Sequence, residues 1–137
     1  PAEAATNAAL ADVLSRVGRP DEALEAAARA LHLKSALTVD EHLDGIGRAY
    51  ALAGRPEEAI APLKQCLARY PNRLDIHLTL AAVYSELDHD AEARAEVAEI
   101  LRLNPRFSLE VHRERVSIKT AATLEHHIAV LRKAGLK

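Results

Sequence analysis

The chain has 137 residues, 49% of them hydrophobic and only 3% aromatic, which favours close-packed helices over a β-sandwich or a large aromatic core. The formal net charge of −2 and the lack of an apolar run of about 18 residues argue against a nucleic-acid-binding protein and a transmembrane helix. With one cysteine and no signal-peptide pattern, we expect a cytoplasmic protein. The chain has no methionine and begins with proline, so we expect a segment of a longer protein.

Two helices are predicted near the start of the chain, at residues 4–17 and 20–33. Gly18 ends the first, because glycine adopts left-handed backbone angles without steric penalty, and Pro20 suits the first turn of the second. The first helix carries the apolar residues Leu10, Val13 and Leu14.

The third predicted helix begins at a capping box formed by Thr38 and Glu41 and ends near residue 53. Residues 54–59 (GRPEEA) then repeat residues 18–23 (GRPDEA) almost letter for letter. This local copy is the best evidence for an internal duplication.

Three further helices are predicted at residues 56–70, 73–87 and 91–103. Asn72 is the expected N-cap of the middle one. The turn before the last of them has Asp88 instead of glycine, and aspartate tolerates left-handed angles better than most residues do.

The remaining residues predict a short helix at 109–116, capped by Ser108, and a final helix at 121–134, capped by Thr120. Gly135 fits a left-handed end position, from which a Schellman motif would fold Leu136 back onto Leu131. The apolar face of the final helix carries Leu124, Ile128 and Leu131.

Charge is unevenly placed along the chain. Residues 1–105 carry 11 Lys+Arg and 17 Asp+Glu, a balance of −6, whereas residues 106–137 carry 7 and 3, a balance of +4. This asymmetry suggests that the basic tail docks on the acidic body or on a neighbouring copy. A solvated surface of mixed charge is the alternative.

A set of positions recurs at an offset of 34 residues toward the C-terminus and, more weakly, of 36 toward the N-terminus. The central set is Leu43, Ile46, Gly47, Tyr50, Gly54, Ala59, Leu63, Cys66 and Pro71. Its copies are His77, Leu80, Ala81, Tyr84, Asp88, Ala93, Val97, Ile100 and Pro105, and Asn7, Leu10, Ala11, Leu14, Gly18, Ala23, Ala27, Ala30 and Ser35. Gly47 would let a second helix lie close to the first, with Leu63 continuing the apolar stripe and Tyr50 filling the space beside it.

This pattern resembles the tetratricopeptide repeat, a helix–turn–helix unit of about 34 residues. The resemblance covers residues 4–105 and implies an all-α solenoid of helical hairpins. The implied single domain spans residues 1–137, with repeats at 4–37, 40–73 and 74–107 and a C-terminal capping segment at 108–137. A partner-binding role for the final helix is the alternative to capping.

The first helix of each tetratricopeptide repeat lines a concave groove, so the resemblance also implies partner-binding positions. They are Asp12, Ser15, Arg16, Glu41, Asp44, Arg48, Leu52, Asp75, Leu78, Ala82, Ser85 and Glu86. Members that grip a C-terminal carboxylate use Lys, Arg and Asn where this chain has Ala8, Asp12, Asp44, Leu78 and Ala82. With five acids and two bases, the groove is expected to prefer a basic or apolar segment; the alternative is that the acids only keep the surface soluble.

A narrower resemblance involves residues 101–108 (LRLNPRFS), Leu124 and residues 131–136 (LRKAGL). They look like the C-terminal end of repeat regions in some bacterial class III adenylate or guanylate cyclases. The resemblance implies a cyclase domain N-terminal to this segment, none of whose metal-binding aspartates or nucleotide contacts can be placed here.

The seven histidines do not have the spacing of a metal site. His126 and His127 are adjacent, so they point about 100 degrees apart on a helix, and His112 has no histidine or cysteine three or four residues away. His77 stands where the repeat often has tryptophan, so helix packing is its expected role. Cys66 is interpreted as a small buried hydrophobe, not a nucleophile. We therefore expect no catalytic residue, cofactor or metal ligand.

The sequence thus predicts a non-catalytic protein–protein interaction or oligomerisation module of a bacterial cytoplasmic signalling protein, as the C-terminal part of a nucleotide cyclase. The alternative is a free-standing adaptor or assembly chaperone that binds a basic or apolar peptide segment. The expected partners are a protein, a peptide or a second copy of the chain, and neither nucleic acid nor membrane. An enzyme in its own right is the least favoured interpretation, because catalytic motifs are missing.

Overall fold

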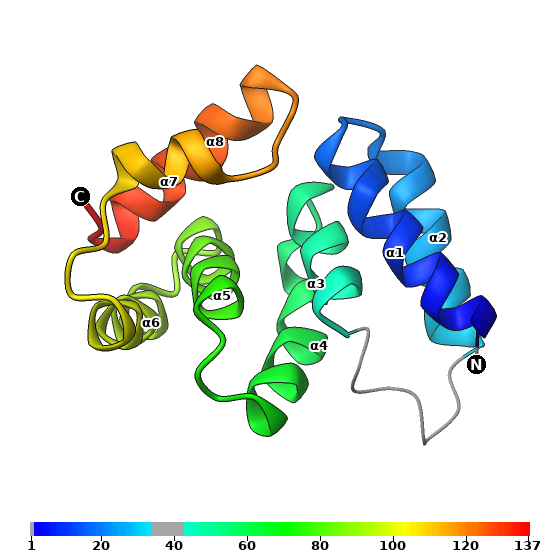
Figure 1. Ribbon diagram of the computed structural model, residues 1–137, viewed down its shortest axis with the longest axis horizontal. Coiled ribbons are helices and arrows are strands. Elements are labelled where there is room, and N and C mark those ends of the chain that lie inside the picture. Colours follow the sequence, from blue (N-terminus) through cyan, green and yellow to red (C-terminus); the bar gives the residue numbers. More distant parts are fainter. Residues whose placement is uncertain (1, 34–42) are drawn as a thin grey trace. The chain divides into compact units, whose positions relative to one another are not determined.

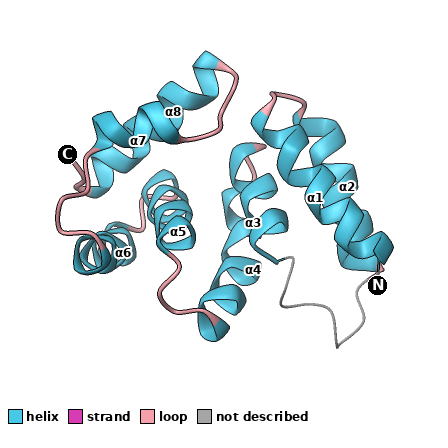
Figure 2. Ribbon diagram, viewed as in Figure 1, coloured by secondary structure: helices cyan, strands magenta, loops and turns pink. Residues whose placement is uncertain are grey.

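The computed structural model describes residues 2–33 and 43–137, and this part of the chain consists of helices, turns and loops without a strand (Figure 1). Figure 2 shows the same elements coloured by type. The helices are α1 (Ala2–Arg16), α2 (Pro20–His32), α3 (Leu43–Leu52), α4 (Pro56–Arg69), α5 (Leu74–Glu86), α6 (Asp90–Leu103), α7 (Leu109–Arg115) and α8 (Ala121–Ala134). The predicted all-α class is confirmed, and the capping box of Thr38 and Glu41 lies outside the described residues. The chain divides into two compact units, unit 1 (Pro1–Pro71) and unit 2 (Asn72–Lys137).

Unit 1 consists of two helical hairpins, α1–α2 and α3–α4, with α3 packed against both helices of the first hairpin. Both hairpins turn in the same way. Gly18 and Gly54 have φ of 83° and 79°, and the next residue donates its backbone N–H to the helix it leaves, Arg19 to Leu14 O and Arg55 to Tyr50 O, each at 2.9 Å. The two predicted glycine turns are therefore confirmed.

The two helices of the second hairpin lie close together at Gly47. A Cβ placed on Gly47 would lie 2.6 Å from both Cγ and Cδ2 of Leu63, which is itself completely buried. The prediction that a missing side chain lets α4 lie against α3 is confirmed.

Unit 2 contains a third hairpin, α5–α6, with α8 packed mainly on α5 and α7 packed on α8. Its turn uses Asp88, with φ of 60°, and His89 N–H donates to Tyr84 O at 2.8 Å, as in the other two turns. At the end of α8, Gly135 has φ of 119°, and Leu136 N–H donates to Leu131 O at 3.2 Å. The Schellman motif is thus present.

Tyr50 and Tyr84, which are 34 residues apart, occupy matching environments in the two units. Both are buried, and burial raises the pKa of each phenol. A neighbouring carboxylate adds to each shift in pKa: Glu58 beside Tyr50, and Glu92, together with Glu96, beside Tyr84. Because Glu58 and Glu92 are also 34 residues apart, the repeat extends to the electrostatics of its interior.

Three local predictions need correction. Asn72 does not cap α5: the N-cap is Arg73, and the Asn72 side chain instead accepts a hydrogen bond from Arg102 at 3.0 Å. Thr120 occupies the N-cap of α8 but makes no capping hydrogen bond, unlike Ser108, whose hydroxyl accepts from Val111 N–H. Leu10 was expected in the interior stripe and is 41% exposed, because α1 has no hairpin preceding it among the described residues.

None of the helices in the described parts of the chain is both long and apolar enough for a membrane span.

Candidate partner-binding site

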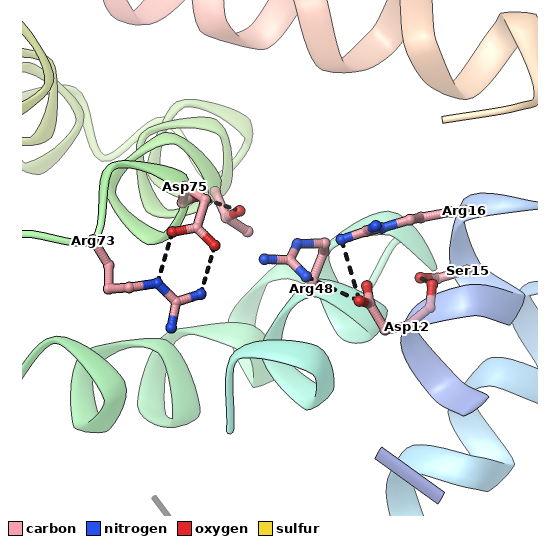
Figure 3. A network of polar contacts seen from close by, with 7 residues as sticks. Asp12, Ser15, Arg16, Arg48, Arg73 and Asp75 are labelled. Atoms are coloured by element: carbon pink, nitrogen blue, oxygen red, sulfur yellow. Dashed lines mark hydrogen bonds and ion pairs between the residues drawn. The ribbon is translucent and has the colours of Figure 1, made fainter. Parts of the chain in front are cut away.

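A polar cluster joins the first helices of the two hairpins in unit 1. Asp12 on α1 accepts a hydrogen bond through Oδ2 from Arg48 on α3 at 3.0 Å. The same oxygen forms an ion pair with Arg16, whose Nη2 lies 3.1 Å away. Ser15 turns its hydroxyl back to donate to the carbonyl of Asp12 at 2.8 Å. Figure 3 shows the two guanidinium groups meeting at the one carboxylate. We call Asp12, Ser15, Arg16 and Arg48 the α1–α3 cluster.

Burial makes the α1–α3 cluster more than a surface ion pair. The side chains of Arg48 and Asp12 are 14% and 20% exposed, and Asp12 Oδ1 is buried and accepts no hydrogen bond from the described residues. Two guanidinium groups and one carboxylate give the cluster a formal charge of +1. The negative charge that the sequence analysis counted at Asp12 is therefore outweighed by the two positive charges of Arg16 and Arg48.

The other predicted positions of unit 1 lie on α3. Asp44 and Leu52 are half-buried, and Glu41 lies outside the described residues. The structure thus brings together four of the predicted positions, Asp12, Ser15, Arg16 and Arg48.

In unit 2 the predicted positions on α5 are largely engaged within the unit. Asp75 accepts two hydrogen bonds from Arg73, at 2.9 and 2.6 Å (Figure 3). Leu78 is only 7% exposed, so its side chain offers a partner little surface. Glu86 lies 3.0 Å from Nε2 of His126 on α8.

Helix α8 supplies contacts that sequence reasoning did not assign to particular residues. Lys133 Nζ donates to the carbonyl of Ser85 at 3.1 Å and pairs with Asp88, while His126 meets Glu86. The predicted docking of the basic tail on acidic residues is borne out here within unit 2. The charge asymmetry along the chain was the available signal, but it did not identify the paired side chains.

Four of the histidines that the structure describes, and the cysteine, are buried or paired with other side chains. Cys66 is buried, as expected. His77 is buried, and its Nδ1 lies 2.5 Å from Glu96 of α6. His126 and His127 point to different partners, whereas His112 meets His127 at 3.0 Å, a contact that local spacing did not predict. No group of three or more metal-ligating side chains occurs in the described segments.

Two family models, both described as tetratricopeptide repeat, match the chain, one over residues 2–72 and the other over residues 50–113. The first match covers more than half of the 137 residues. No curated protein sequence and no solved structure matches the chain.

Proposed function

We infer that this chain, which belongs to the tetratricopeptide repeat family, is a protein–protein interaction module that holds a segment of another polypeptide on α1 and α3. Tetratricopeptide repeats generally bind proteins or peptides and are generally non-catalytic, consistent with the prediction that this segment is not an enzyme. The observation that carries the proposal is the α1–α3 cluster, which places partly exposed polar side chains on the first helices of successive hairpins.

The pairing of Asp12 bears on the chemistry of the partner. A basic segment would have to compete with Arg16 and Arg48 for this carboxylate, and the pair with Arg48 is largely buried, with the Asp12 and Arg48 side chains 20% and 14% exposed. Apolar contacts, including one to the half-buried Leu52, would then supply more of the binding energy. We therefore propose an apolar segment, with basic residues in a secondary role.

The test is fluorescence anisotropy with three labelled peptides: one apolar, one rich in Lys and Arg, and one with an acidic C-terminus. The apolar peptide should bind most tightly with little dependence on salt, and Leu52→Ser should weaken its binding several-fold. Lys64→Glu, at an exposed position on α4, is the matched control and should leave binding unchanged. Tight, salt-sensitive binding of the acidic peptide, or no binding of any peptide, would refute the proposed partner chemistry.

The wider context is also proposed. The resemblance at residues 101–136 supports a parent protein that is a bacterial cytoplasmic nucleotide cyclase, in which residues 1–137 form one non-catalytic domain. A cyclase assay on the full-length gene product tests this parentage, and an adaptor without cyclase activity is the competing outcome. Self-association, the other proposed role, is measured by light scattering across a range of protein concentrations.

A further inference from the structure

Two histidines meet between α7 and α8 in unit 2. Nε2 of His112 lies 3.0 Å from Nε2 of His127, and the ring centroids are 5.2 Å apart. The ring of Phe107 lies against the other side of His112, with centroids 5.6 Å apart. A neutral imidazole has one N–H donor and one acceptor nitrogen, so this contact is a hydrogen bond when one Nε2 carries hydrogen and the other does not.

The surroundings do not favour a positive charge on this histidine pair. Burial lowers the pKa of both rings. For His127, burial together with the proximity of His112 and His126 lowers the pKa to about 4. No hydrogen bond or ion pair joins a carboxylate of the described residues to either ring.

None of the charged side chains that the structure describes on the elements packed around the pair makes a hydrogen bond or ion pair with either ring, the exposed Glu110 and Glu114 of α7 included. On α7, Arg113 pairs with Glu125 of α8, and Glu86 of α5 meets His126 rather than His127. Helix α6 also packs on α8, but no hydrogen bond or ion pair links it to the histidine pair. If both rings were protonated, no carboxylate would be hydrogen-bonded to either ring to balance the two positive charges.

We propose that the contact between His112 and His127 is an acid-sensitive switch that keeps α7 docked on α8 and releases it when both rings are protonated. Two imidazolium groups at this separation repel each other and have no acceptor between them. The other ties of α7 are few: the buried side chain of Leu109, its N–H bond to Lys137 O at 2.9 Å, and the pair of Arg113 with Glu125. Release of α7 would expose the side chain of Leu109 and so enlarge the apolar surface of unit 2. This pH-dependent change is separate from the partner binding proposed above.

The experiment is an NMR titration of the whole chain from pH 8 to about pH 3, following the histidine rings and amide hydrogen exchange together. The rings of His112 and His127 should titrate below the ordinary range for histidine. Over the same interval, exchange at the Leu109 amide should accelerate at least tenfold after correction for the intrinsic pH dependence. Unchanged protection of this amide while both rings take up protons would overturn the proposal.

Variants separate this switch from general acid unfolding. His127→Gln keeps a hydrogen-bonding side chain but cannot acquire a charge, so α7 should stay protected to lower pH than in the parent chain. His112→Gln should behave in the same way and is the alternative if the first variant does not fold. His32→Gln, on α2 of unit 1, is the control that should retain the parent profile. Equal loss of Leu109 protection in the parent chain and in both pair variants would refute the proposal.

Discussion

The close approach at Gly47 leads to a quantitative prediction for the Gly47→Ala variant. The added Cβ would lie 2.6 Å from two atoms of Leu63, which is fully buried. Overpacking of this kind costs about 1–3 kcal/mol, whereas replacing glycine by alanine inside a helix returns about 1 kcal/mol. We expect a net loss of about 1 kcal/mol in the free energy of unfolding.

The third hairpin suggests the compensating change. There Ala81 stands at the position of Gly47 and Val97 at the position of Leu63, and both are buried. Leu63→Val alone should cost about 1 kcal/mol for one buried methylene. In the double variant valine removes Cδ2, one of the two Leu63 atoms that the new Cβ would meet, but keeps a γ carbon, so the two costs should add only in part. The double variant should be more stable than the sum of the single effects by about 1 kcal/mol.

Urea unfolding followed by far-UV circular dichroism measures all four proteins of this cycle. Leu63→Ala is the upper reference, with an expected loss of about 2–5 kcal/mol for a fully buried leucine. The reasoning would be refuted if the changes in unfolding free energy of the two single variants added to that of the double variant within about 0.5 kcal/mol. A Gly47→Ala variant more stable than the parent would also refute it, because the added Cβ would then fit between the helices without a clash.

Three further outcomes are expected. Arg48→Ala should lower the free energy of unfolding by about 1–3 kcal/mol, because Asp12 loses a partly buried charged partner, whereas Arg19→Ala, in an exposed pair, should change it by less than about 0.5 kcal/mol in the same urea assay. Cys66 should react with a thiol reagent only after unfolding, and rapid labelling of the native chain would contradict its burial. The free energy of unfolding should fall as pH drops from 6.5 to about 4, because over that range the unfolded chain binds a proton at His127 that the folded chain does not. The full effect is on the order of 3 kcal/mol. Urea unfolding at each pH measures it, and a free energy that does not change with pH would contradict the prediction.

The sequence predicted the hairpins well because their determinants are local. A left-handed residue between two helices needs glycine or a tolerant residue, so Gly18, Gly54 and Asp88 could be identified without a structure. The same holds for Gly135, whose N–H and that of Leu136 bond to carbonyls within the last turn. Hydrogen bonds between residues no more than about five positions apart, as in these turns, depend mainly on residue type and backbone geometry.

Contacts between helices were harder to predict because they depend on how hairpins pack. His112 and His127 are 15 residues apart, and no repeat offset relates them. Asp12 and Arg48 are 36 residues apart, which is the offset between the first two repeats, but the offset identifies matching positions and not which side chains pair. Both arginines of the α1–α3 cluster were assigned to the expected site, but their shared carboxylate was counted as a free acid. The error at Asn72 has the same origin, since Arg102 of another helix competes for its side chain.

The aspartate at the third turn limits how interchangeable the hairpins are. Asp88 has the backbone angles that glycine adopts in the other turns, and its carboxylate also binds Lys133 of α8. Replacing Asp88 by glycine would relieve the backbone strain at this turn, but it would remove the ion pair between the turn and Lys133 of α8. An engineered array that duplicates the last hairpin should therefore keep this aspartate only in the copy next to α8 and use glycine in every internal copy.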